Sequence, residues 1–423
     1  MLRFASSPTG DMHIGDLRVA LLNYIVSKQK NEDFIVRIDD MDKEKNIEGK
    51  DQEIADLLSL FNIEYAQIVY QSQNFRFHSA MALDLLHKKK AFACFCSDEW
   101  LEKKREEAKA KNRAYHYDDA CRNLPAELVI DNTAPFTVRI VRPDAPIVVH
   151  DKIKGDLSFE PDAVDSFIIM RQDKTPTEEF ACAVDDMLSD VSLVIRSEEN
   201  LNKTPKQIHV RNALGYEKEI EYAHLPYILD EETLSVKSLL EKGYLPEAIS
   251  NYLISIGNKL PKEIFTLDEA KEWFTLEGIS DSPARFDMEK LKQINKEHLK
   301  RMDATELSRY VGFADADIGE LARIYVEEAG TTQELKAKIA PIFEPREIPE
   351  ALVKPVTRIK EVLQKAVHFE AYDDFKDYLT KETNLKEENL SKALRVLLTN
   401  SEDGPDIANI YKYLKNYIGE IVK

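Results

Sequence analysis

Residues 3–16 read Arg-Phe-Ala-Ser-Ser-Pro-Thr-Gly-Asp-Met-His-Ile-Gly-Asp, and this stretch decides the fold. A short apolar run passes into a loop of small residues. Apolar residues then recur at helical spacing, at Leu17, Ala20, Leu21, Tyr24 and Ile25. The pattern predicts a strand, a small-residue loop and a helix. Because the start of a helix presents unpaired N–H groups and partial positive charge, it favours an anion.

Two residues at this helix start suit phosphate chemistry. His13 can give a phosphate a hydrogen bond or a positive charge, and Gly15 lets a ligand approach the backbone. His-Ile-Gly alone recurs by chance. Its place ten residues after Arg3, behind Ser-Pro-Thr-Gly, makes it far more specific. The alternative is a structural strand–loop–helix with a surface histidine.

The same alternation of strand and helix continues along the first half of the chain. Residues 33–38 form a β-branched apolar run typical of a buried parallel strand, and residues 48–62 carry a helical apolar pattern. This order is typical of an α/β nucleotide-binding sheet. We expect an insertion at about 75–180, with a Lys/Glu-rich helix at 98–111 and short strands such as 136–141. Residues 181–229 return to the sheet.

The second half of the chain has a different pattern. From about residue 240 it is almost wholly helical, with no comparable strand signal, and residues 342–349 form a proline-containing loop. The 423 residues suit two or three domains, and 43% apolar content is ample for their cores. No apolar run could span a membrane and the first residues lack the core of a signal peptide, so we expect a cytoplasmic protein.

Charge and cysteine content narrow the function. A net charge of −19 argues against broad non-specific nucleic-acid binding, although a local basic groove remains compatible with it. The four cysteines are too few for a disulfide scaffold. Cys94 and Cys96, with Cys121 further on, instead predict a structural zinc site. Its fourth ligand is open, with His116 the ordinary candidate; three reduced, packed cysteines are the alternative. Cys182 is expected on a core strand as a small buried residue.

Several ordered segments resemble the bacterial glutamyl-tRNA synthetases of class I. The first is the Ser-Pro-Thr-Gly…His-Ile-Gly stretch. The others are Arg37–Asp42, Phe180–Met187 (which resembles the family's central strand and turn), Arg196–Glu199, Thr204–Gln207, Gly243–Ala248 and Leu394–Thr399. The resemblance implies a Rossmann-type catalytic domain at 1–240 whose insertion binds the acceptor stem. A helical stem-contact region at 241–305 and an all-helical anticodon-binding domain at 306–423 would follow.

The resemblance also implies the chemistry. Glutamate would be activated by ATP and transferred to tRNA(Glu), with Mg²⁺ accompanying ATP, and charging of tRNA(Gln) stays open. The implied ATP contacts are Thr9, His13 (also the catalytic residue), Gly15 and Glu198. The implied glutamate contacts are Arg3, at the end of the first strand, Ser7, Asp39 and Arg196. Arginine is the preferred carboxylate clamp because its fork bonds both oxygens. In zinc-containing relatives Tyr117 completes the metal site, and the family precedent is a monomer.

Departures from the family's pattern matter as much. Ser6 stands where proline is usual, Met41 replaces a threonine, and Glu178 replaces a tyrosine of the glutamate pocket, where a carboxylate would repel the substrate. The family's Lys-Met-Ser-Lys-Arg loop should lie between Leu229 and Ser235, but the chain has only Asp-Glu-Glu-Thr-Leu there. Roughly eight residues are thus missing. Lys237, the nearest lysine, is expected on the following helix.

The missing segment has two explanations. Either the chain lacks the loop, or a mobile loop has been left out of the sequence as it is read, and the clean excision between matched segments favours the second. The alternative function is therefore a tRNA- or nucleotide-binding paralogue with impaired activation. A third candidate is the shorter relative that glutamylates a modified nucleoside in tRNA, but its chain ends before the helical half.

Overall fold

The computed structural model describes residues 1–130, 132–229 and 234–422. These divide into two compact units. The first contains residues 1–236, 253–261 and 265–286, and the second contains residues 237–252, 262–264 and 287–423. Within the described residues, no helix combines the length and apolar character that crossing a membrane requires.

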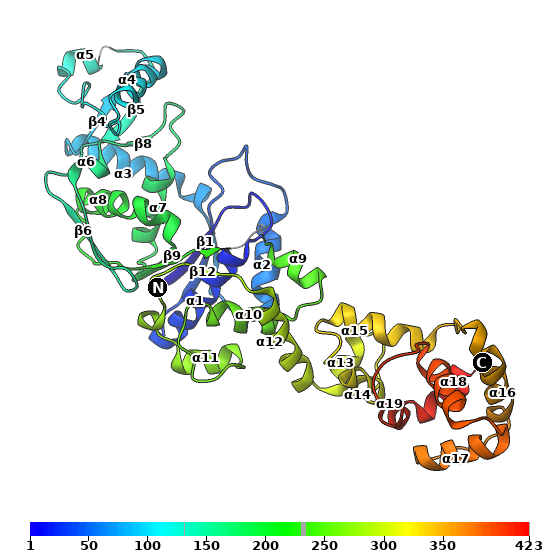
Figure 1. Ribbon diagram of the computed structural model, residues 1–423. Helices are drawn as coiled ribbons and strands as arrows, with labels where there is room; N and C mark the ends of the chain where they lie inside the picture. Colours follow the sequence, from blue (N-terminus) through cyan, green and yellow to red (C-terminus); the bar gives the residue numbers. More distant parts are fainter. Residues whose placement is uncertain (131, 230–233, 423) are drawn as a thin grey trace. The chain divides into compact units, whose positions relative to one another are not determined.

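A seven-stranded sheet is the centre of the first unit (Figure 1). In spatial order its strands are β3 (Ile68–Tyr70), β2 (Phe34–Ile38), β1 (Leu2–Ser6), β9 (Leu193–Ser197), β10 (Glu221–Leu225), β6 (Ile147–Asp151) and β7 (Gly155–Phe159). All neighbouring pairs are parallel except β6 and β7. The strand order reverses between β1 and β9, which confirms the expected Rossmann-type core.

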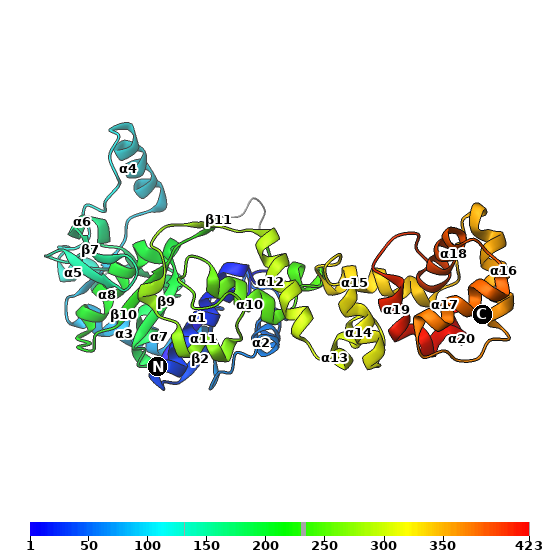
Figure 2. The same ribbon diagram turned by 60° about the horizontal axis from the view of Figure 1, so that its bottom comes forward.

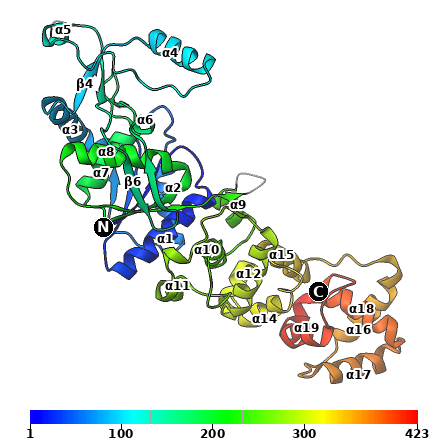
Figure 3. The same ribbon diagram turned by 60° about the vertical axis from the view of Figure 1, so that its left-hand side comes forward.

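Helices cover the sheet because their apolar faces need burial. Helix α1 (Ile14–Lys30) packs on β1 and β9 and against α11 (Leu267–Trp273). Helices α7 (Glu178–Leu188) and α8 (Thr204–Leu214) lie beside each other, with α8 against β6 (Figure 3). Helix α2 (Lys50–Leu60) follows β2, as the apolar spacing predicts.

The segment expected as an insertion has its own small sheet. Its antiparallel strands are β4 (Ala91–Cys94), β5 (Thr137–Ile140) and β8 (Ile168–Met170), and its helices are α3 (Phe75–His87), α4 (Asp98–Ala110), α5 (Ala126–Ile130) and α6 (Pro161–Val164). The predicted helix at 98–111 and strand at 136–141 are therefore present. Unexpectedly, β6 and β7 join the main sheet, since β6 pairs with β10 at Asp151 and Tyr222.

One predicted element is wrong. Residues 180–187 were expected as the family's central strand and turn, but they lie within helix α7, and so does Cys182. The buried residues Phe180, Ala183 and Val184 have helical rather than alternating spacing, and two glutamates fill the first turn. Arg3 is likewise the second residue of β1 and not its last.

The second half is helical, with one exception. Strand β12 (Ala284–Arg285) pairs with β11 (Ile228–Leu229) in the first unit, so the expectation of no strand beyond residue 240 is wrong by one short pair. The remaining helices are α9 (Val236–Glu241), α10 (Pro246–Ser255), α12 (Met288–Arg301), α13 (Ala304–Tyr310), α14 (Ala316–Ile324), α15 (Thr332–Ile339), α16 (Val353–Leu363), α17 (Tyr372–Thr383), α18 (Glu387–Thr399), α19 (Ile407–Leu414) and α20 (Ile418–Ile421). Helix α18 packs against α16, α19 and α20 around a leucine-rich core (Figure 2).

Candidate active site

The reversal of strand order places the candidate site. In open α/β sheets, ligands bind beyond the carboxyl ends of the strands at such a point. Here the loop after β1 leads into helix α1, and a short 3₁₀ helix (Glu198–Lys203) begins directly after β9. A pocket opens at this place. It is lined by His13, Gly15, Asp16, Arg18, Val19, Ser197, Glu199, Leu225, Pro226, Tyr227 and Ile228.

His13 caps helix α1. Its Nδ1 accepts a hydrogen bond from the Gly15 N–H at 3.1 Å, and the Asp16 carboxylate completes a capping box with the His13 N–H. With Nδ1 used as an acceptor, Nε2 is the nitrogen that carries the proton in the neutral ring. A Cβ added at Gly15 would lie 3.2 Å from His13 Nδ1, so glycine leaves room for this cap. The helix start expected from the sequence is therefore confirmed.

The two other expected ATP contacts lie differently. Thr9 is exposed in the loop after β1. Glu198 forms an ion pair with Lys154 and accepts the Tyr227 N–H at 3.0 Å, so it holds a wall residue of the pocket. Its neighbour Glu199 lines the pocket.

Two buried arginines share one acid beneath the site. Asp186 accepts Arg37 Nη1 at 2.6 Å and Arg3 Nε at 3.2 Å, and Arg37 Nε also bonds Asp39 at 2.7 Å. Although burial alone would raise the pKa of Asp186, Arg3 and Arg37 outweigh it and hold that pKa well below its usual range. Burial raises the pKa of Asp39, and Arg37 opposes this effect. Arg3 and Asp39 thus meet at the site as expected.

Arg196 differs from these two arginines. It is 9% exposed, and its Nε donates to His224 Nε2 at 3.2 Å and its Nη2 to Thr204 Oγ1 at 2.6 Å. In the described ranges no carboxylate forms an ion pair with it. Burial lowers its pKa to about 10, and the nearby Arg3 charge acts in the same direction. Arg196 is therefore a buried cation that an anionic ligand would neutralise.

Three further positions bear on the expected glutamate pocket. Ser7 is exposed in the loop after β1. Cys182, buried on α7, lies 3.3 Å from Arg37 Nη2 and 3.8 Å from Asp39 Oδ2, and burial raises the pKa of its thiol to about 12. Glu178 is exposed and paired with Lys203 at 2.5 Å, so its repulsion of an anionic substrate is largely offset.

The segment expected to hold the lysine loop falls on residues 230–233, which lie outside the described residues, and so does the question of an ordered chain through Thr233. The described residues on its carboxyl side meet the start of α1. The Leu234 carbonyl accepts the Ile14 N–H at 3.2 Å, and Ser235 bridges to His13. Lys237 lies on α9, as expected. The segment therefore connects directly to the His13 region.

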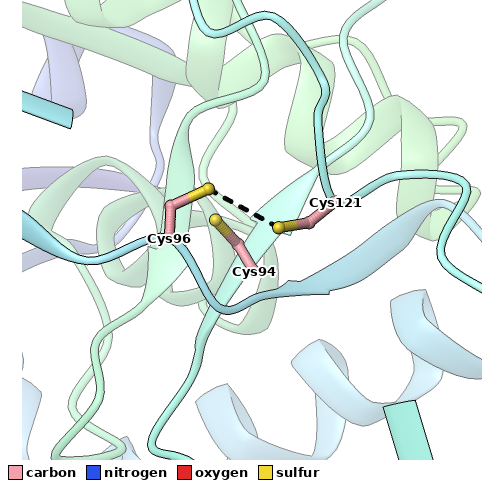
Figure 4. A group of neighbouring side chains, drawn as sticks. All are labelled: Cys94, Cys96 and Cys121. Atoms are coloured by element: carbon pink, nitrogen blue, oxygen red, sulfur yellow. Dashed lines mark hydrogen bonds between the residues drawn. The ribbon is translucent and has the colours of Figure 1, made fainter. Parts of the chain in front are cut away.

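The cysteine cluster is a second candidate site, away from the first. The Sγ atoms of Cys94, Cys96 and Cys121 lie within 4.8 Å of one another and point together (Figure 4). The buried Tyr117 hydroxyl is 3.3 Å from both Cys94 and Cys96, whereas His116 is exposed. Burial would raise the pKa of Cys94, but Tyr117 and Arg139 lower it below its usual value. The geometry thus favours Tyr117 over His116 as the fourth ligand.

Three residues at the site were not among the predicted ones. Arg37 stood in the quoted Arg37–Asp42 segment without a role, and Asp186 lay in a segment expected to be a strand. Lys203 had no signal, because its pairing with Glu178 depends on how the 3₁₀ helix meets α7.

Comparison with known proteins follows this geometry. The family model of class I tRNA synthetases (E and Q), catalytic domain, matches residues 1–293. The chain is 64% identical to glutamate–tRNA ligase 2 of Sulfurimonas denitrificans and 51% identical to glutamate–tRNA ligase 1 of a Nitratiruptor species, over 100% of each chain. Both alignments extend over 432 positions, nine more than this chain's 423 residues. A crystal structure of a glutamate tRNA ligase from Elizabethkingia meningosepticum with its amino acid matches 99% of this chain and 97% of that one (TM-score 0.83, 25% identity).

Proposed function

The chain belongs to the class I tRNA synthetases of the glutamate and glutamine type, and we propose that it is an ATP-dependent ligase that attaches glutamate to tRNA(Glu). The observation that carries the choice of glutamate is Arg196, a buried guanidinium without an acidic partner in the described ranges, close to Arg3 and Asp39. The side-chain carboxylate of glutamate would supply the missing charge, and Asp39 would receive the ammonium group.

Activation joins the glutamate α-carboxylate to the α-phosphate of ATP, releases pyrophosphate and needs no protein nucleophile. The protein positions the reactants and stabilises charge on the phosphates. The start of α1 suits this task because its N–H groups and the His13 Nε2 face the pocket after β1 and β9. His13 and Gly15 would contact ATP, with Thr9 and Glu198 as further contacts, and Arg3, Ser7, Asp39 and Arg196 would hold glutamate. Mg²⁺ bound with ATP would neutralise part of the phosphate charge.

The alternative is a paralogue with impaired activation, and the absent lysine loop is the observation behind it. Lysines there would stabilise the charge that builds on the triphosphate. The curated relatives, matched over their whole length, favour the active ligase. The nine additional alignment positions show that the relatives possess residues with no counterpart here. Sequencing the encoding gene between the codons for Thr233 and Ser235 decides whether the loop is deleted.

The experiment is a charging assay with purified protein, ATP, Mg²⁺ and total bacterial tRNA, in which labelled glutamate, glutamine and aspartate are compared. Glutamate should be attached to tRNA at least a hundredfold faster than either competitor. Transcripts of tRNA(Glu) and tRNA(Gln) tested separately decide the tRNA specificity. Glutamine charged as well as glutamate would overturn the assignment of Arg196 as a carboxylate clamp.

We also propose that Cys94, Cys96, Tyr117 and Cys121 hold one structural Zn²⁺. Their donor set fits this metal, because thiolates are its preferred ligands and Arg139, 3.4 Å from Cys94 Sγ and stacked over Tyr117, offsets their negative charge. Protein purified without metal affinity resins should contain about one zinc per chain. Cys121→Ser should lose the zinc and Tyr117→Phe should bind it more weakly. A zinc-free chain whose thermal stability is unchanged by EDTA would contradict the site.

The remaining expectations stay proposals. The segment at 75–180 would contact the acceptor stem, residues 241–305 the tRNA stem, and the helices of 306–423 the anticodon. A monomeric state and a cytoplasmic location are also predicted.

A further inference from the structure

Behind Arg196 lies a buried hydrogen-bond chain that the reaction itself does not require. Asp151 Oδ2 is 2.6 Å from His224 Nδ1, and His224 Nε2 is 2.8 Å from Thr204 Oγ1. Both Thr204 and His224 are also bonded to the Arg196 guanidinium. His224 and Thr204 are fully buried, and Asp151 is nearly so.

The sheet itself assembles this chain. Register pairs His224 on β10 with Arg196 on β9 and Tyr222 on β10 with Asp151 on β6, and Thr204 begins α8. Asp151 is further fixed by the N–H groups of Ile153 and Lys154, at 2.9 and 2.8 Å. The entry of β6 into the main sheet therefore supplies the acid at the far end of the chain.

The bonds are compatible with only one protonation state of His224. The Arg196 Nε–H and the Thr204 hydroxyl both donate to Nε2, so Nε2 must be unprotonated, and Nδ1 carries the proton that Asp151 accepts. Thr204 Oγ1 in turn accepts from Arg196 Nη2. A proton on Nε2 would place three donors together and break the chain.

We propose that Asp151, His224 and Thr204 are positioning residues that fix two nitrogens of Arg196, so that its remaining Nη1 is held toward the substrate carboxylate. This inference rests on the proposed function, in which Arg196 binds glutamate. In the described part of the chain no hydrogen bond occupies Nη1. Preorganisation matters here because a flexible arginine loses side-chain entropy when it binds a ligand.

Protonation of His224 should accordingly weaken glutamate binding. The charged groups that face His224 are Asp151 from β6, Arg196 from β9 and Arg3 from β1, and Tyr222 of its own strand stacks on it at 5.9 Å. Burial and the two arginines keep the ring neutral, and Asp151 opposes them. Glutamate use should therefore decline on the acid side of neutrality while ATP use does not.

The test compares Thr204→Val, which removes the hydroxyl at nearly constant volume, with Thr204→Ser, which keeps it. In charging assays Thr204→Val should raise the KM for glutamate about tenfold, the effect of one charge-assisted hydrogen bond, with the KM for ATP unchanged. Thr204→Ser should behave like the wild type. His224→Gln, whose amide does not titrate, should flatten the acid decline of kcat/KM for glutamate.

The outcomes separate this inference from the proposed function. If the wild type does not charge glutamate, the proposed function fails. If the wild type charges glutamate but Thr204→Val leaves its KM unchanged, or Thr204→Val and Thr204→Ser raise it equally, the positioning role is overturned. Equal increases in the KM for glutamate and for ATP would indicate a general distortion and also overturn it.

Discussion

Replacing Arg196 with methionine should make the protein more stable and at the same time insensitive to glutamate. Burial lowers the pKa of Arg196 from 12.5 to about 10, so the unfolded chain binds this proton more tightly than the folded chain does. Below pH 10 the charge therefore destabilises the fold, by about 3 kcal/mol at 1.36 kcal/mol per pKa unit. Loss of the bonds to His224 and Thr204 costs about 1 kcal/mol each. The expected net gain is about 1 kcal/mol.

The assay is urea unfolding with and without glutamate, followed on the transition that glutamate shifts. Glutamate at a hundred times its Kd should stabilise the wild type by about 2.7 kcal/mol and Arg196→Met not at all. Arg37→Met is the matched control, because Arg37 is equally buried but paired with Asp39 and Asp186. It should destabilise by about 3–5 kcal/mol, since it leaves buried acids without a partner. Arg196→Met that is destabilised as strongly as this control, or still stabilised by glutamate, would refute the reasoning.

Three further predictions follow from other contacts. Asp186→Asn should reduce the free energy of unfolding by about 3–5 kcal/mol, because Arg3 and Arg37 lose their shared counter-charge; a loss under 1 kcal/mol in urea unfolding would contradict this. Gly15→Ala should raise the KM for ATP several-fold with little change in Tm, because the new Cβ would press on His13 Nδ1 at 3.2 Å; an unchanged KM would count against the His13 cap. Burial lowers the pKa of His298 to about 4, so the unfolded chain takes up its proton first and stability should fall as pH drops from 6.5 to about 4. His298→Gln should reduce that pH dependence in thermal unfolding, and equal slopes would argue against it.

The sequence predicted what depends on local pattern. The start of α1 with His13 and Gly15, the buried strand β2 and the helix at 98–110 all follow from apolar spacing and cap chemistry, and the structure contains them. The cysteine spacing likewise placed three thiols that the fold brings together.

What the sequence could not provide depends on contacts between distant segments. Nothing near Asp151 indicates that β6 pairs with β10, yet that pairing places Asp151 behind His224. The error at 180–187 has a different cause, because the resemblance to a strand was followed although Phe180, Ala183 and Val184 have helical spacing. The ion pair of Glu178 with Lys203 is also a tertiary contact, so the glutamate alone wrongly suggested net repulsion.

The stoichiometry of AMP release tests the central claim most directly. The protein is incubated with ATP, Mg²⁺, labelled glutamate and tRNA(Glu), and AMP and glutamyl-tRNA are quantified together over time. An active glutamate–tRNA ligase should form one AMP for each glutamyl-tRNA, and Arg196→Met should form neither at the same glutamate concentration. AMP formed independently of glutamate, or no AMP and no charged tRNA from a wild-type protein that binds all three substrates, would contradict the account.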